Sequence, residues 1–414
     1  MEPPPSLLHP PLLLDGAMGT TLRGAGMPAD ACAEIWALAH PALVIDIQRR
    51  FAAAGSDVLY TPTFGANRLS LLRSGEQASP SRVRDLNRQL AALTQEAAVR
   101  ETGRRCLVAG NLSGYGLPPD AEDAPSFDEL LAAYSEQAAA LKEAGVDCLV
   151  CETMTGLSEA RAALLAARET GLPVMVTLTV NEEGETLTGA RLLPAVITLQ
   201  ALGAAAVGLN CSAGPASMAE WLEDALPYAA VPLIAKPSAA FPNREHGWTA
   251  LDPAAFAAGM EPLLDAGAVL VGGCCGAGPE HLALLRGLVD RHPTVVSTEI
   301  DTDAAAGEQE AFFLSDDLDP SPPLVCDSNL SDELIEAEDE YNVAVVHVTC
   351  VQDVDELIRQ ASMSRLPTAV HADSVLLLEE ALRRYPGRLL VDTMSEADDS
   401  LIGELAARYG AILF

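Results

Sequence analysis

Short apolar runs alternate with helix-like segments along the first 300 residues, and this rhythm restricts the folds open to the chain. Each run is continuously apolar, which is typical of parallel strands that helices cover. Eight strand–helix units in about 290 residues predict an α/β fold, a (β/α)8 TIM barrel, with an open doubly wound sheet as the alternative. The runs begin at Leu12, Val58, Cys106, Cys148, Val174, Ala205, Leu233 and Val269.

Polar, small and metal-capable residues follow several of these predicted strands. Examples are Asp15-Gly16, Glu152-Thr153, Asn210-Cys211 and Gly272 to Cys275. In a barrel of this kind the C-terminal ends of the strands carry the active site. Polar loops alone would explain aspartate or serine, but not cysteine, a residue type that is usually buried, at two strand ends. We therefore expect a functional site there.

The composition changes after residue 300. Fourteen acidic residues and no Lys or Arg lie between Asp301 and Glu340, and prolines interrupt this stretch, which predicts an acidic linker over 299–322. A second strand–helix rhythm follows, with too few units to close an eight-stranded barrel. We predict a barrel domain over 1–298 and a smaller, incomplete α/β domain of βα repeats over 323–414.

Charge and cysteine usage exclude several classes of protein. The 414-residue chain has 59 acidic and 25 basic residues, a net charge of −34. Nucleic acids and anionic membranes require clustered Lys and Arg, so we expect neither as a partner. Nine unevenly spread cysteines do not form a disulfide framework, and the proline-rich start lacks a cationic segment, so we expect a cytoplasmic protein.

Three cysteines give the strongest chemical signal. Neighbours on a regular strand face opposite ways, so Cys274 and Cys275 cannot both enter one site from a strand. The glycines on either side free the backbone to turn both thiols one way. With Cys211 they can form a three-thiolate set, which selects zinc and leaves a fourth position for substrate. Structural or redox-active cysteines, including a strained Cys274–Cys275 disulfide, are the alternative.

Such a zinc site suits one kind of chemistry better than others. Thiolates donate charge, so the metal activates water weakly, but it can bind a substrate thiol and lower its pKa. The sulfur then becomes a nucleophile for alkylation at neutral pH. Hydrolytic zinc sites more often use histidine and carboxylate ligands.

Two carboxylates and a small-residue segment are candidates for substrate binding. Asp15 and Glu152 lie at separate strand ends on the same predicted face, where a substrate α-ammonium group would find partners. Helix capping is the alternative for Asp15. Gly16, Gly19 and the two threonines that follow are expected to form a turn whose N–H groups can approach a substrate carboxylate.

Several motifs together carry a family resemblance. LLDGAMGT occurs at 13–20, GLNCS at 208–212 and GGCCG at 272–276, with further matches at 152–154, 186–189 and 279–281. Over roughly residues 10 to 295 the chain resembles the homocysteine S-methyltransferase family, in particular the homocysteine module of cobalamin-dependent methionine synthase. The resemblance implies that Cys211, Cys274 and Cys275 bind Zn²⁺ and form the catalytic centre. It also implies that Asp15 and Glu152 hold the homocysteine amino group. We expect Gly16, Gly19 and Asn210 to bind the substrate as well.

The same resemblance implies a reaction, in which zinc-bound homocysteine sulfur attacks a methyl group and methionine forms. No Asp-x-His-x-x-Gly corrinoid motif occurs, so methylcobalamin is expected on a separate corrinoid protein. One enzymatic alternative uses S-methylmethionine or another methyl donor. An alternative from another class is a homocysteine or zinc sensor without catalysis. After Lys236-Pro237 the family usually has Asn-Ala-Gly, whereas Ser238-Ala239-Ala240 stands here.

The tail has a resemblance of its own. Residues 366–413 are similar to part of the pterin-binding barrel that follows this module in methionine synthase, through VHADS at 370–374, ALRRYPGRLL at 381–390 and VDTMS at 391–395. The family usually has Asn where Asp392 stands. A short parallel sheet exposes an edge and apolar surface, so we expect a structural or docking role, with a homo-oligomer as one way to cover it.

Overall fold

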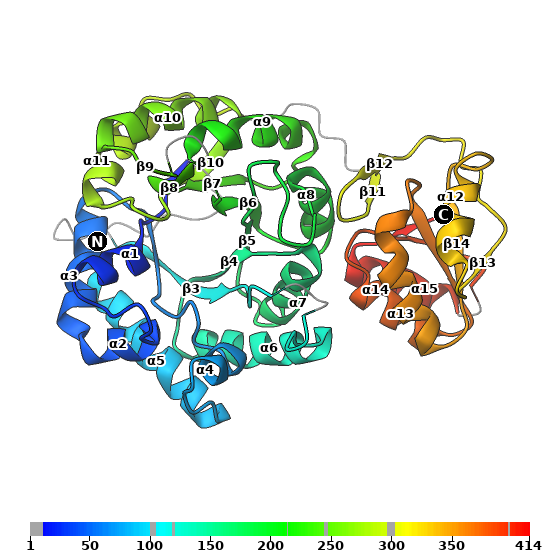
Figure 1. Cartoon of the computed structure of the whole chain (residues 1–414), viewed down its shortest axis with the longest axis horizontal. Coiled ribbons are helices and arrows are strands. Elements are labelled where there is room, and N and C mark those ends of the chain that lie inside the picture. Colours follow the sequence, from blue (N-terminus) through cyan, green and yellow to red (C-terminus); the bar gives the residue numbers. More distant parts are fainter. Residues whose placement is uncertain are drawn as a thin grey trace. The chain divides into compact units, whose positions relative to one another are not determined.

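The structure is a computed structural model that describes residues 11–99, 105–117, 121–212, 214–243, 247–295, 303–395 and 398–414. The chain divides into two compact units (Figure 1). The first comprises Met1–Thr188, Ala204–Pro227 and Val231–Thr298, and the second comprises Gly189–Gly203, Tyr228–Ala230 and Glu299–Phe414. The domain boundaries given above stay a prediction.

Eight parallel strands form the main sheet of the first unit, in the order β1-β10-β7-β6-β5-β4-β3-β2. Each of the eight apolar runs forms one of these strands. Figure 1 shows them as a ring inside a layer of helices, which confirms the barrel over the open sheet. The strands are β1 (Leu12–Leu13), β2 (Val58–Tyr60), β3 (Leu107–Ser113), β4 (Cys148–Met154), β5 (Val174–Leu178), β6 (Ala206–Cys211), β7 (Leu233–Pro237) and β10 (Ala268–Val271).

Asp57 joins the two end strands of this sheet, β1 and β2. Its N–H donates to the carbonyl of Leu13 at 2.6 Å, and its Oδ2 accepts from the N–H of Leu13 at 3.0 Å. Arg286, on helix α11 (Pro279–Val289), donates to the same oxygen at 2.9 Å. These bonds close the ring where β1 and β2 have no regular strand pairing.

The core of the barrel consists of alternate strand residues that point inward, among them Leu12, Tyr60, Val150, Met175 and Ile234. Local signals start the helices outside it: α6, for example, begins at a capping box formed by Ser126 and Glu129. None of the described helices is long and apolar enough to cross a membrane. The helices are α1 (Met18–Gly24), α2 (Ala33–Ala39), α3 (Pro41–Ala53), α4 (Arg68–Arg73), α5 (Pro80–Ala97), α6 (Phe127–Glu143), α7 (Leu157–Arg168), α9 (Pro215–Ala225) and α10 (Pro253–Asp265), and a hairpin of β8 (Ala240–Asn243) and β9 (Gly247–Ala250) follows β7.

The second unit contains a five-stranded parallel sheet whose strands lie in chain order, which confirms an incomplete α/β domain. Its strands are β13 (Leu324–Val325), β14 (Ala344–Val348), β15 (Thr368–Ala372), β16 (Leu390–Val391) and β17 (Ile412–Leu413). The helices between them are α12 (Leu330–Ala337), α13 (Val351–Gln360), α14 (Val375–Arg384) and α15 (Asp399–Tyr409).

Part of the segment expected to be a linker is instead a β-hairpin. Strands β11 (Ala304–Ala306) and β12 (Ala311–Phe313) pair antiparallel. Ala305 and Phe312 pack against the five-stranded sheet, and Ala304 and Ala306 pack against Ile197 of α8 (Leu192–Ala201). The two apolar runs are only three residues long, and the many acidic residues around them hide this pattern in the sequence.

Candidate metal and substrate site

The three candidate thiols come together at the C-terminal ends of β6 and β10. Their sulfur atoms lie within 4.8 Å of one another, and Cys211 Sγ is 3.6 Å from Cys275 Sγ. Two sulfurs at about 2.3 Å from one zinc ion, at the tetrahedral angle, are about 3.8 Å apart. The sulfur spacing therefore fits a shared zinc ion. All nine cysteines are free thiols, so Cys274 and Cys275 do not form the disulfide considered above.

The backbone at these cysteines adopts conformations that few residues take. Cys211 and Ser212 have φ angles of 58° and 53°, in the left-handed region. Gly276 has a φ of 81°, and a Cβ there would lie 2.6 Å from the Cβ of Ala240. Non-glycine residues in this region are concentrated at functional sites. The turn permitted by glycine brings Cys274 and Cys275 to the same side, beside Cys211.

The three thiols favour one thiolate among them. Hydrogen bonds from Cys274 and, next, from Cys275 lower the pKa of Cys211 far below its usual range, and Ser238 Oγ also donates to this sulfur at 3.7 Å. The pKa of Cys274 is raised well above its usual value, chiefly because its thiol bonds to the Cys211 sulfur. A negative charge is thus already stabilised at the position where a cation would bind.

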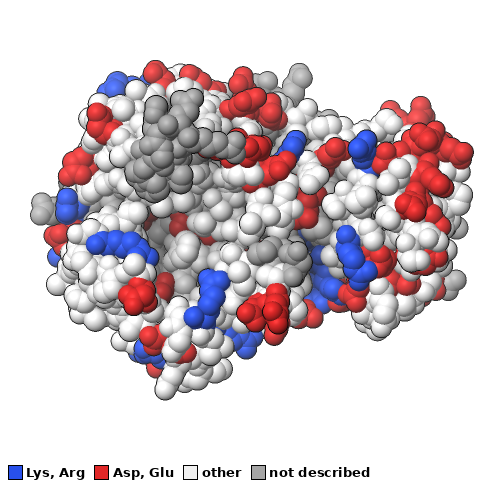
Figure 2. All heavy atoms as spheres, viewed as in Figure 1, with Lys and Arg blue, Asp and Glu red and all other residues white. Residues whose placement is uncertain are grey.

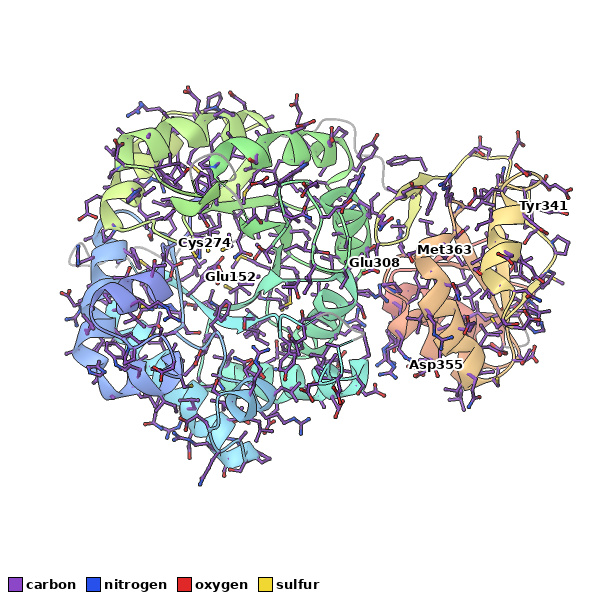
Figure 3. All side chains as sticks on the ribbon, viewed as in Figure 1. Glu152, Cys274, Glu308, Tyr341, Asp355 and Met363 are labelled. Atoms are coloured by element: carbon purple, nitrogen blue, oxygen red, sulfur yellow. The ribbon has the colours of Figure 1, made fainter. Side chains whose placement is uncertain are left out.

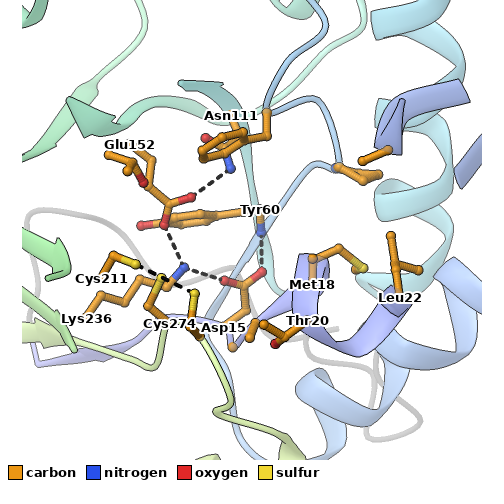
Figure 4. Close-up of a pocket in the computed structure, with 18 of the residues that line it drawn as sticks. Asp15, Met18, Thr20, Leu22, Tyr60, Asn111, Glu152, Cys211, Lys236 and Cys274 are labelled. Carbon is orange, nitrogen blue, oxygen red and sulfur yellow. Dashed lines mark hydrogen bonds and ion pairs between the residues drawn. The ribbon is translucent and has the colours of Figure 1, made fainter. Parts of the chain in front are cut away.

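A buried lysine lies between the two candidate carboxylates (Figure 4). Lys236, in β7, donates from Nζ to Asp15 Oδ1 and to Glu152 Oε1, both at 3.0 Å. Burial alone would lower the pKa of Lys236, but the two carboxylates outweigh it and raise that pKa well above its usual value. The lysine therefore remains an ammonium. Burial raises the pKa of Asp15, while Lys236 acts in the opposite direction.

Tyr60 and Asn111 complete this polar cluster. The N–H of Tyr60 donates to Asp15 Oδ2 at 2.8 Å, and Nζ of Lys236 lies 3.9 Å from the centre of the Tyr60 ring. Asn111 Nδ2 donates to Glu152 Oε2 at 3.0 Å. Within the described part of the chain, the Tyr60 hydroxyl and Asn111 Oδ1 are buried without a hydrogen-bond partner. Since buried polar atoms are normally paired, these two atoms are available to a ligand that binds in this cluster.

One pocket of about 280 Å³ joins the thiols and the polar cluster. Figure 3 shows Glu152 and Cys274 projecting into the centre of the barrel, and Figure 4 shows Met18 and Leu22 on the side away from Cys211. The pocket is therefore charged and metal-capable at one end and apolar at the other. Its lining includes Asp15, Met18, Leu22, Tyr60, Phe64, Asn111, Glu152, Cys211, Lys236, Cys274 and Cys275.

Gly16 and Gly19 also line this pocket, but the turn expected after β1 is mostly helical. Helix α1 begins at Met18, so Gly19 and the two threonines after it are helical. The reason is that Thr21 N–H already bonds to the carbonyl of Ala17, at 3.2 Å, which starts the helix inside the expected turn. Gly16 is required for space, because a Cβ there would lie 2.5 Å from the carbonyl oxygen of Ala277.

Asn210 is fully buried and joins the ends of β4 and β6. Its Oδ1 accepts from the N–H of Thr153 at 2.9 Å, and its Nδ2 donates to Thr153 Oγ1 at 2.8 Å. Thr153 has a φ of 60°, so Asn210 holds the unusual conformation of the residue directly after Glu152. This gives Asn210 a positioning contact, and its direct contact with substrate stays a prediction.

The sequence alone did not assign a role to Lys236, Tyr60 or Asn111. Lys236 carries a usable signal, because it is one of only two lysines and ends an otherwise apolar strand. A charged residue in a buried strand normally needs a partner, and Asp15 and Glu152 are carboxylates expected at the same face. Asn111 carries a weaker signal, because it follows the apolar run that begins at Cys106, at the face where the site is expected. Tyr60 lies within an apolar run and has no comparable signal.

The site lies in a region that matches a known family. The sequence profile described as Homocysteine S-methyltransferase matches residues 12–289. The chain belongs to the homocysteine S-methyltransferase family. It is 30% identical to the methionine synthase of Mycobacterium leprae over 294 residues, which cover 67% of this chain and 24% of that protein. The methionine synthase of Mycobacterium tuberculosis is 31% identical over 287 residues, which cover 65% of this chain and 24% of that protein. The chain thus spans about a quarter of the length of these relatives.

Solved structures of homocysteine methyltransferases share the fold. The metallated form of MmuM from Escherichia coli has a TM-score of 0.57 at 22% identity, and the match covers 68% of this chain and 98% of that one. The oxidized form has a TM-score of 0.56 at 24% identity, and the match covers 67% of this chain and 95% of that one. At such identities the likeness shows the fold alone. The thiols, the carboxylates and Lys236 all lie within residues 12–289, the part of the chain that matches the family.

Proposed function

We propose that the chain is a zinc-dependent homocysteine S-methyltransferase that forms methionine and receives its methyl group from a separate methyl-corrinoid protein. One observation carries the proposal: three thiols and a buried cluster of two carboxylates and a lysine line the same pocket. Membership of the family and relatives named methionine synthase support the choice of substrate.

Cys211, Cys274 and Cys275 would hold the zinc ion. Their spacing fits the metal, and the low pKa of Cys211 already favours one thiolate. When bound, zinc lowers the pKa of a substrate thiol and so supplies a thiolate nucleophile at neutral pH. Ser238 stands where the family resemblance has Asn, and its hydroxyl would continue to stabilise the charge on Cys211.

The carboxylate–lysine cluster would bind the α-ammonium group of homocysteine. When Asp15 and Glu152 are both ionised, Lys236 balances one of their two charges, which leaves one negative charge buried. Because an uncompensated buried charge is costly, the cluster favours a second cation. Asn111 Oδ1 is an acceptor without a partner among the described residues and can take one N–H of that ammonium.

These contacts would fix the amino-acid end of the substrate and leave its thiol to reach the cysteines. The cluster is buried, so the ammonium would be held away from water, where charge-assisted hydrogen bonds are stronger. At the other end of the pocket Met18, Leu22 and the partly exposed Phe64 would face the methyl donor. The chain's own residues thus supply binding and orientation for the transfer.

Methionine formation tests this proposal. Zinc-loaded protein would be incubated with homocysteine in three parallel reactions, each with a different methyl donor. The donors are a methyl-corrinoid protein, free methylcobalamin and S-methylmethionine. We expect methionine with the corrinoid donors, and we expect Cys275→Ser to abolish it and to lower the zinc content. Cys350→Ser, which changes an exposed thiol of the second unit, is the control and should retain both.

The alternatives give different results. If methionine forms with S-methylmethionine and with neither corrinoid donor, the methyl donor in the proposal is wrong and S-methylmethionine takes its place. Homocysteine binding without methionine from any donor would contradict the enzymatic proposal and favour a sensor.

A further inference from the structure

The second unit contains its own group of metal-capable side chains. Among the described residues, two groups bring three ligand atoms within 4.8 Å of one another: the three cysteines of the barrel, and His347, His371 and Asp373. We propose that His347, His371 and Asp373 bind a divalent first-row transition-metal ion. Two imidazoles and one carboxylate are a known ligand set for such ions and leave coordination positions open. This proposal is independent of the reaction in the barrel.

Strand register explains why these residues meet. His347 in β14 and His371 in β15 are direct partners in the parallel sheet, so their side chains leave the same face side by side. Asp373 follows His371 by two residues and therefore continues on that face. The same face is apolar farther from the strand ends, where the hairpin packs on it through Val343, Val345, Ala369 and Leu390. The face thus changes from apolar packing to metal-capable groups at the C-terminal edge of the sheet.

Each histidine already lies against a carboxylate. His347 Nε2 is 2.6 Å from Asp373 Oδ1, and His371 Nδ1 is 2.8 Å from Asp392 Oδ2. The two imidazole rings are also neighbours, with centroids 4.8 Å apart and an angle of 74° between their planes. Since Nδ1 of His371 is engaged by Asp392, Nε2 is its nitrogen for a metal ion.

Asp392 has the features of a carboxylate that orients a metal-binding histidine. Its Oδ1 accepts from the N–H of Met394 at 2.8 Å, so the carboxylate is fixed while its Oδ2 bonds to His371. Metal-binding histidines usually pass their second ring nitrogen to such a carboxylate, which sets the tautomer and the ring orientation. This gives Asp392, which stands where the pterin-binding resemblance has Asn, a positioning role.

The group is open to solvent and lies in an acidic chain. The side chains of His347 and Asp373 are 30% and 43% exposed, so an ion can enter and keep positions for water or an anionic ligand. The net charge of −34 attracts cations in general. A histidine–carboxylate pair alone does not make such a site. His292 and Asp265 form a pair of this kind, with Nε2 3.0 Å from Oδ1, but no third ligand joins the pair in the described part of the chain.

Cobalt titration of the full chain tests the proposal. The thiol site is first filled with one equivalent of zinc, and Co²⁺ is then added while metal content and the visible spectrum are followed. We expect one further equivalent of cobalt without thiolate-to-cobalt charge-transfer absorption. His347→Ala, His371→Ala and Asp373→Ala should each lose it, whereas His292→Ala should retain it. Circular dichroism would show that each variant is folded.

A positioning variant separates a metal site from two simple ion pairs. Asp392→Ala should weaken Co²⁺ binding by about ten- to a hundredfold, and Asp392→Asn, which keeps an acceptor for His371, should recover most of it. The proposal is overturned if the folded chain takes up no cobalt beyond the zinc site. It is equally overturned if the added cobalt shows only thiolate charge-transfer absorption, or if the two histidine variants bind it as the wild type does.

Discussion

Lys236 makes it possible for two carboxylates to share one buried pocket. Asp15 and Glu152 would repel each other across the barrel interior if both were ionised and alone. Nζ of Lys236 lies 3.0 Å from an oxygen of each carboxylate and forms a three-residue cluster with them. With both carboxyls ionised, this cluster carries one negative charge. Lys236 therefore compensates one of the two buried charges and would leave the other for the cationic ligand proposed above.

Replacing this lysine should be strongly destabilising. Lys236→Met leaves the two carboxylates without a buried counter-charge, so the free energy of unfolding at neutral pH should fall by about 3–5 kcal/mol. The loss should shrink as the pH is lowered, because protonated carboxyl groups need no counter-charge. Urea unfolding at several pH values measures both effects.

Lys142, the other lysine of the chain, gives the control for this prediction. It lies exposed on α6, and Lys142→Met should change the stability by well under about 1 kcal/mol. Equal losses from the two variants would show that Lys236 does not compensate buried charge.

At the scale of elements, the closure of the barrel depends on Asp57. It links β1 to β2 through Leu13 and binds Arg286 from α11 with an almost fully buried carboxylate, only 3% exposed. Asp57→Ala should therefore lower the free energy of unfolding by about 3–5 kcal/mol, since it removes one partner of a buried ion pair. Chemical denaturation measures this.

Asp290→Ala is the matched control, because Asp290 pairs with the same Arg286 but is 61% exposed. An exposed pair contributes about 0–1 kcal/mol, so this variant should unfold almost as the wild type does. If Asp57→Ala were as mild, the ring would not depend on the Asp57 link.

The same scale shows what the sequence could and could not predict. The barrel strands were predictable because each is buried on both faces and therefore continuously apolar, as in Val58–Tyr60 and Ala268–Val271. The cysteine cluster was predictable because glycines around Cys274 and Cys275 limit what the backbone can do. The contacts of Lys236 were not, because its partners lie 221 and 84 residues away and no local pattern links them. The hairpin at 304–313 was missed because its strands are too short to show periodicity.

At the scale of the whole molecule, negative charge dominates the surface. Figure 2 shows acidic side chains spread over the visible face and gathered over α12, whose sequence continues into Glu338, Asp339 and Glu340. Such a surface disfavours polyanions and would accelerate binding of a positively charged partner. A methyl-carrier protein with a basic docking face would therefore associate faster at low ionic strength than at high.

The second unit should not serve as a folate site in this chain. Asp373 and Asp392, which lie in the segments similar to a pterin-binding barrel, are each engaged by a histidine, and the hairpin packs on the same face of the sheet. A pterin would have to break these pairs before it could bond to the carboxylates. We therefore expect no saturable binding of methyltetrahydrofolate to the intact chain in calorimetry, with or without Co²⁺, while homocysteine binds the zinc-loaded barrel in the same buffer. Micromolar folate binding that disappears in Asp373→Ala would show instead that the carboxylates are available and that the second unit can present a methyl donor.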